Sequence, residues 1–226
     1  MTTDRPRLLA ADEVATYLSA VAWLIELLRH DDVASVWDGP SALAHYTVGG
    51  VAAHAVQGGL LRLEQLLADP EPSGGRVVLV GEYFGPNRMA DPGDDDPLFA
   101  LLRARAEEFA RQGPGAVAAA CMASRDELAR VLPQARADRA MPSARVPEGR
   151  APLSDYLRTR VLEVIVHGDD LAASVSGWSA PDPPPAAVEV CLALCVDLAR
   201  ARVGGVATLR AFTRAERAHP GALRVL

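Results

Sequence analysis

The sequence predicts an all-α fold in which several helices pack into one bundle. Apolar residues recur three and four positions apart over segments of helical length, the pattern of helices with one buried face. Glycine and proline separate these segments, and only residues 77–80 resemble a strand, so no alternation of strands and helices indicates a parallel sheet. The 226 residues, half of them apolar, can bury a substantial core and are expected to form a single domain over residues 1–226.

The first two predicted helices have clear boundaries. One runs from Asp12, a suitable N-cap, to Arg29. Its expected core positions are Val14, Leu18, Val21, Ile25 and Leu28. The other runs from Thr47, whose hydroxyl can cap it, to Ala68, where Asp69-Pro70 stops it. Its expected inward residues are Val48, Val51, Leu60, Leu63 and Leu67.

Two more helices are predicted after a long connection over residues 69–96. Asp96 is a capping acid and Pro97 suits the first helical position, so a third helix is expected to start there. The breaker sequence at residues 112–115 ends it. A fourth apolar segment over residues 117–132 predicts the next helix, which stops before a proline.

The second half of the chain predicts a long helix and a closing helix. Residues 133–152 are expected to form a loop. Ser154 can then cap a helix that extends to about Ser176. A proline-rich linker over residues 181–185 precedes a last helix at 186–203, which two glycines end, and an arginine-rich tail follows.

The composition excludes several classes of function. All 23 basic residues other than histidine are arginine, so lysine-dependent chemistry such as Schiff-base formation is excluded. The formal net charge is −6, and no basic segment is suited to a phosphate backbone, so nucleic acid is not an expected partner.

Cysteine usage and hydropathy predict where the protein works. Cys121, Cys191 and Cys195 are too few for a disulfide framework and form no CxxC pair, which favours a reducing cytoplasm. The sequence shows neither a signal-peptide pattern nor a long uncharged apolar run. We therefore expect a soluble cytoplasmic protein with no membrane partner.

The long helix of the second half carries a polar seam along an otherwise apolar pattern. Arg160, Glu163, His167 and Asp170 follow one another at spacings of three and four, so they share a helix face. Unpaired charges are costly to bury, so such a seam inside a bundle needs a reason. The Glu163/His167 spacing suits two ligands of one metal ion, and it is also typical of an ordinary surface pair.

A third candidate ligand lies in the second predicted helix. His54 is surrounded by apolar residues, where a histidine is either a hydrogen-bonded core residue or a ligand. With Glu163 and His167 it makes a set of two imidazoles and one carboxylate. Such a set leaves coordination positions open and suits zinc or non-haem iron in a catalytic site. The remaining histidines, His30, His45 and His219, are interpreted as surface residues.

Two segments resemble a known family. Residues 46–54 and 159–172 are similar to motifs of the mycothiol-dependent maleylpyruvate isomerase family, in the DinB-like superfamily, and the resemblance covers residues 10–176. It implies a DinB-like four-helix bundle, here with an additional C-terminal helix and tail. It also implies that His54, Glu163 and His167 bind a divalent metal, usually zinc. Asp170 matches the aspartate of the family's His-Gly-x-Asp motif and is expected, with Arg160, at the catalytic centre.

The resemblance also implies a reaction. Members of the family use mycothiol, a small thiol, whose thiolate adds to an electrophilic small-molecule substrate. An adduct that expels the thiol again makes the enzyme an isomerase, and an adduct that persists makes it an S-transferase. Two alternatives stay open: a hydrolase that uses a metal-activated water, and a non-catalytic helical module that binds a small ligand. A homodimer, in which two copies share one helix face, is a further alternative.

Overall fold

The computed structural model describes residues 7–82, 96–143, 146–218 and 221–223, and most of them are helical. The expectation of an all-α fold is confirmed. The helices are α1 (Ala11–Leu28), α2 (Asp31–Ser35), α3 (Val48–Val56), α4 (Arg62–Ala68), α5 (Pro97–Ala110), α6 (Pro114–Val131), α7 (Leu153–Ala173), α8 (Pro185–Val203) and α9 (Gly205–Thr213). A π-helical turn, η1 (Gln57–Leu61), joins α3 to α4. Short 3-10 turns are η2 (Val80–Glu82), η3 (Leu132–Gln134) and η4 (Ala215–Arg217).

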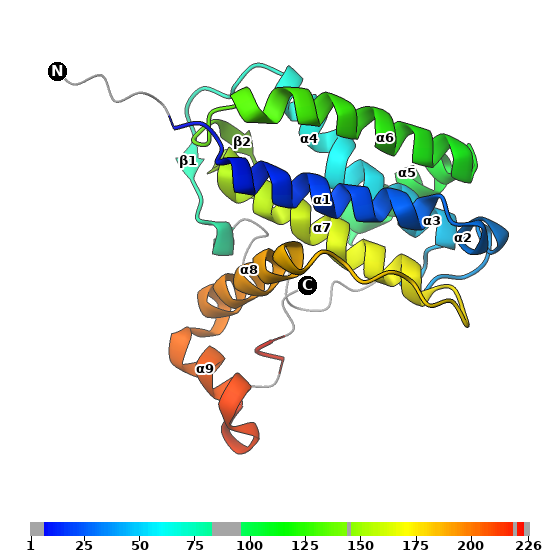
Figure 1. The fold of residues 1–226 in the computed structure, drawn as a ribbon. Helices are drawn as coiled ribbons and strands as arrows, with labels where there is room; N and C mark the ends of the chain where they lie inside the picture. The colour runs from blue at the N-terminus through cyan, green and yellow to red at the C-terminus, as the bar shows by residue number, and fades with distance from the viewer. Residues whose placement is uncertain (1–6, 83–95, 144–145, 219–220, 224–226) are drawn as a thin grey trace.

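Helices α1 and α7 lie side by side through the middle of the molecule (Figure 1). Helix α6 packs along α1, and α8 packs along α7. Helix α3 contacts both α5 and α7, so it links the two. Helix α9 packs on α8 and points away from the other helices (Figure 1). In the part of the chain that the structure describes, no helix is long and apolar enough to cross a bilayer.

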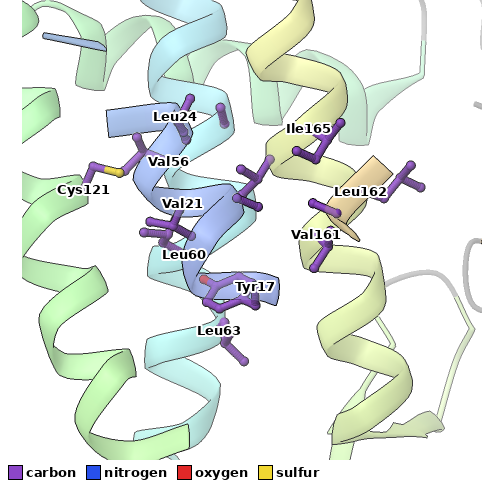
Figure 2. Packing of buried hydrophobic residues seen from close by; sticks show 14 of the residues in the cluster. Tyr17, Val21, Leu24, Val56, Leu60, Leu63, Cys121, Val161, Leu162 and Ile165 are labelled. Carbon is purple, nitrogen blue, oxygen red and sulfur yellow. The ribbon is translucent and has the colours of Figure 1, made fainter. Parts of the chain in front are cut away.

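The hydrophobic core lies where α1, α7, α6 and the α3–η1–α4 segment meet (Figure 2). The buried face of α1 is centred on Tyr17, Val21 and Leu24, which are all fully buried. Of the predicted stripe, Leu18 and Ile25 are only partly buried because they lie at the edges of this face. The inward residues predicted for the second helix are buried, except Leu67 near its end, which is partly buried. The buried ones are Val48, Val51, Leu60 and Leu63.

Two predicted helix starts are confirmed by their capping hydrogen bonds. The Thr47 hydroxyl accepts from the Gly50 N–H, and the Asp96 carboxylate accepts from the Leu98 N–H, each at 2.8 Å. The other four starts were predicted one to three residues late, and α6 begins at Pro114, within the predicted breaker at residues 112–115. Helix α1 starts at Ala11. The carboxylate of Glu13, its third residue, accepts a hydrogen bond from the N–H of Ala10, the residue before the helix. Helix α7 starts at Leu153, directly after a strand that ends in proline.

The second predicted helix spans the expected residues but is interrupted by the π-helical turn η1. A wider turn leaves carbonyl groups outside the regular ladder of hydrogen bonds, and other groups must satisfy them. Tyr17 donates its hydroxyl to the Gly59 carbonyl at 2.9 Å, and Arg160 donates Nη1 to the Gly58 carbonyl at 2.6 Å. Residues on α1 and α7 therefore hold this turn in place.

The predicted loop over residues 133–152 and the predicted tail both contain regular structure. Strands β2 (Ala140–Pro142) and β3 (Gly149–Pro152) pair antiparallel, and β1 (Arg76–Val77) pairs parallel with β3. The strand expected at 77–80 shares only Val77 with β1, since Val80 begins the turn η2, and the tail begins with α9. Strands of two to four residues are too short to show a period of two, so the sequence pattern did not reveal β2 and β3 and placed β1 late.

Helices α1 and α7 approach closely at Gly168. A Cβ atom at this position would lie 2.2 Å from Cζ3 of Trp23, which is far inside van der Waals contact. The indole cannot easily turn away, since its Nε1 donates to the Pro181 carbonyl at 2.8 Å. The absence of a side chain at Gly168 therefore sets the distance between the two central helices beside His167.

We expect Gly168→Ala to destabilise the protein by about 1–3 kcal/mol, because the added methyl group forces Trp23 out of place. Urea unfolding followed by circular dichroism measures this. Gly115→Ala is the matched control, since nothing lies within 4 Å of a Cβ there. Equal free energies of unfolding for the two variants would contradict this account of the packing.

Candidate metal centre

The three predicted ligands come together between α3 and α7. His54 contributes one atom from α3, and Glu163 and His167 contribute one each from α7, and these atoms lie within 4.8 Å of one another. The imidazole rings of His54 and His167 meet edge to face, with their centroids 4.7 Å apart. The Glu163 and His167 side chains each keep 17% of their surface exposed. The group is thus enclosed by helices and still reachable from solvent.

Small residues in the π-helical turn allow the two helices to approach at this point. A Cβ atom on Gly58 would lie 3.4 Å from Oε2 of Glu163, and one on Gly59 would lie 2.6 Å from Cγ2 of Val164. A side chain at the second position would push α7 away. The glycine pair therefore brings the Glu163 carboxylate within reach of His54.

The other two residues of the seam orient the candidate ligands. Asp170 Oδ2 lies 3.0 Å from Nδ1 of His167, so this nitrogen donates to the carboxylate and Nε2 faces Glu163 at 3.4 Å. Arg160 is almost fully buried, and its Nη2 lies 3.6 Å from Oε1 of Glu163. Its guanidinium also stacks over the Tyr156 ring, 4.7 Å from the centroid. The arginine thus holds one oxygen of Glu163 and leaves the other facing the histidines.

The charges in the seam determine its protonation. Burial lowers the pKa of His167, but hydrogen bonds to Asp170 and Glu163 outweigh this and raise it to about 9. Burial raises the pKa of Glu163, but the hydrogen bond to His167 and the charge of Arg160 hold it well below its usual range. At neutral pH the metal-free site therefore contains an imidazolium between two carboxylates.

Two contacts near His54 were not predicted from the sequence. The Tyr46 ring lies 5.5 Å from the His54 ring, centroid to centroid. Glu107, on α5, accepts hydrogen bonds from the backbone and the hydroxyl of Thr47 at 2.8 Å each. One local feature of the sequence points to such a contact. An acid at the third helical position often pairs with a Thr N-cap, and this position is Gly50, so the acid has to come from another part of the chain.

The cysteines and the remaining described histidines are not members of this candidate ligand group. Burial raises the pKa of the Cys121 and Cys191 thiols to about 12, so neither is a nucleophile at neutral pH. His30 and His45 are exposed, as expected, and His30 stacks on a tryptophan ring. His219 lies outside the described residues.

The raised pKa of His167 predicts how the metal-free protein responds to pH. The folded value of about 9 exceeds the unfolded value of about 6.5, so the imidazolium stabilises the fold fully below pH 6.5. This contribution is lost as the pH rises through 9. We expect the His167 Cε1 resonance to titrate near pH 9 in NMR, and Asp170→Asn to lower that midpoint. Asp169→Asn, a change at an exposed neighbour, serves as the control, and an equal shift in both variants would refute the role of Asp170.

Comparison with known proteins identifies the family. The profile described as "Mycothiol maleylpyruvate isomerase N-terminal domain" matches residues 16–172, which is more than half of the chain and includes all three candidate ligands and Asp170. No curated protein and no solved structure matched the chain. By this match over its main helices, the chain belongs to the mycothiol maleylpyruvate isomerase N-terminal domain family.

Proposed function

We propose that this protein is a metal-dependent enzyme that uses a small thiol, mycothiol, to act on an electrophilic small-molecule substrate. The observation that carries the proposal is the group of His54, Glu163 and His167, with ligand atoms within 4.8 Å of one another. Membership of a mycothiol-linked family supports the choice of thiol.

The donor set fits a divalent metal ion. Two imidazole nitrogens and one carboxylate oxygen make three protein ligands, which suits zinc and leaves further positions for a thiol or a substrate. The same set also suits non-haem iron. Asp170 holds Nδ1 of His167, the arrangement that fixes the tautomer and the orientation of a ligating histidine. Arg160 occupies Oε1 of Glu163, so Oε2 is the oxygen available to a metal.

The proposed chemistry rests on the cation that the site can bind and on the high pKa values of two buried cysteine thiols. A divalent cation bound there supplies Lewis acidity, which lowers the pKa of a thiol and gives a thiolate at neutral pH. Cys121 and Cys191 are buried with pKa values of about 12, which favours a sulfur that comes from a cosubstrate. The chain's own residues orient the site: Asp170 and Glu163 fix His167, and Arg160 fixes Glu163.

Two reaction outcomes share one first step. The thiolate sulfur forms a bond to one carbon of an activated alkene, and the π electrons move onto the conjugated carbonyl group. If the adduct rotates and the same carbon–sulfur bond breaks, the thiolate leaves and the product is the geometric isomer. If the neighbouring carbon instead takes up a proton from water, which balances the proton that the thiol released on ionising, the thioether persists and the reaction is an S-transfer.

The remaining expectations extend this proposal. We propose that residues 1–226 work as one domain, which the packing of α8 along α7, the helix of the seam, supports. A cytoplasmic location is supported by three free cysteines. The homodimer stays a prediction, which sedimentation of the purified chain tests.

The metal content of the purified protein tests the ligand assignment. We expect about one zinc or iron ion per chain, and its loss in a His54→Ala/His167→Ala variant that still folds by circular dichroism. Asp170→Asn is expected to weaken metal binding by about 10–100-fold, because it removes a group that orients a ligand. His30→Ala/His45→Ala is the control at two exposed histidines. Equal metal content in the wild type and the ligand variant refutes the assignment.

Dependence on thiol tests the reaction class. We expect turnover of conjugated cis-alkenes only when both metal and mycothiol are present, and background rates for His54→Ala. Product analysis by NMR then separates the isomer from the thioether. Turnover of an ester or amide without any thiol supports a hydrolase instead. Bound metal without any of these activities favours the non-catalytic module and contradicts the proposal.

A further inference from the structure

The N-terminus of α3 has an incomplete capping box. In a capping box, the N-cap hydroxyl accepts from the backbone N–H of the third helical residue, and the side chain of that third residue accepts from the N-cap N–H. Thr47 provides the first half, since its Oγ1 accepts from the Gly50 N–H at 2.8 Å. The third helical residue is Gly50, which has no side chain to provide the second half.

Glu107 provides the missing half from a different helix. Its Oε1 accepts from the Thr47 N–H at 2.8 Å, and its Oε2 accepts from the Thr47 hydroxyl at 2.8 Å. A Cβ atom on Gly50 would lie 2.0 Å from Oε1 of Glu107 and 2.6 Å from its Cδ. The carboxylate therefore lies in the space that a side chain on residue 50 would need. This arrangement requires glycine at position 50.

This carboxylate lies on the same face of α3 as His54. Gly50 precedes His54 by four residues and Gly58 follows it by four, so all three share one face. Each glycine faces a carboxylate from another helix, Glu107 from α5 and Glu163 from α7. Helical side chains lean toward the N-terminus of their helix, and the His54 ring lies 5.5 Å, centroid to centroid, from the ring of Tyr46, which directly precedes Thr47.

Other contacts join the same two parts of the chain. Trp37 donates Nε1 to the Ala110 carbonyl at 3.0 Å, and Gln57 donates Nε2 to the Arg105 carbonyl at 3.4 Å. Among these ties, the Glu107 contact is the one made by a charged group at the end of α3. A carboxylate at a helix N-terminus also interacts favourably with the helix dipole.

We propose that Glu107 is a positioning residue for His54: it completes the capping box of α3 from α5 and so fixes the turn that sets the imidazole in the metal centre. The inference rests on the proposed function in one respect, that His54 is a metal ligand. It assigns to α5, which supplies none of the three ligands, a role in the affinity of the site.

Zinc affinity of the full chain, measured by competition with a chelator, tests this role. We expect Glu107→Ala to weaken zinc binding about tenfold, as the loss of a group that orients a ligand does. The visible spectrum of the cobalt-loaded protein is expected to change as well, because the His54 nitrogen is less well placed. Glu108→Ala is the matched control: Glu108 is the exposed neighbour on α5 and pairs with Arg111 on the surface.

A relocated acid provides the rescue. Gly50→Glu/Glu107→Ala places a carboxylate at the third position of α3, where it can reach the Thr47 N–H within its own helix. We expect this double variant to recover most of the zinc affinity and the wild-type cobalt spectrum. Gly50→Glu alone is expected to be less stable than the wild type, because the new side chain meets the Glu107 carboxylate.

Hydrogen exchange of the metal-free chain separates failure of the Glu107 positioning role from failure of the proposed metal centre. We expect the amides of residues 47–51 to exchange about fivefold faster in Glu107→Ala and at the wild-type rate in Glu108→Ala. Faster exchange with unchanged zinc affinity and cobalt spectrum makes Glu107 a cap only, which overturns the positioning role. A wild-type chain that binds no zinc or cobalt overturns the proposed metal centre and this role with it. Exchange rates then still decide whether Glu107 caps α3.

Discussion

The structure depends on one constraint: four charged or titratable side chains lie along α7 inside a helical fold. Such groups are costly to bury unless each has a partner. Asp170 and Glu163 flank His167, and Arg160 pairs with Glu163 while it donates to the Gly58 carbonyl. The charged groups of the seam thus have their ion-pair partners along α7, and Arg160 also binds the neighbouring π-helical turn. Burial of the seam and the shape of that turn are therefore coupled.

Glycine positions show how closely the helices must approach for this to work. Gly168 allows Trp23 of α1 to pack against α7, and Gly59 allows Val164 to pack against the turn. Gly50 leaves the space that the Glu107 carboxylate occupies. Glycine has a low intrinsic helix propensity, so these residues weaken their helices locally. Here they are the positions where neighbouring helices meet.

Local signals in the sequence were sufficient for the fold class and for the residues of the seam. The caps at Thr47 and Asp96 rest on hydrogen bonds within three residues, and the seam rests on the helical repeat. The π-helical turn, the small sheet and the Glu107 contact depend on groups that are distant in the sequence, so a local pattern could not reveal them. His54 was found only as a histidine out of place in an apolar helix, and its proximity to α7 came from the fold.

The net charge of the seam depends on the protonation of His167. An arginine guanidinium does not lose its proton in proteins, so Arg160 is a permanent positive charge beside Glu163. With His167 protonated, the four side chains of the seam carry two positive and two negative charges and are balanced. Loss of the His167 proton leaves one negative charge in excess and frees Nε2. In the proposed metal centre, deprotonation of His167 therefore both frees a ligand nitrogen and leaves the net negative charge that favours a metal cation.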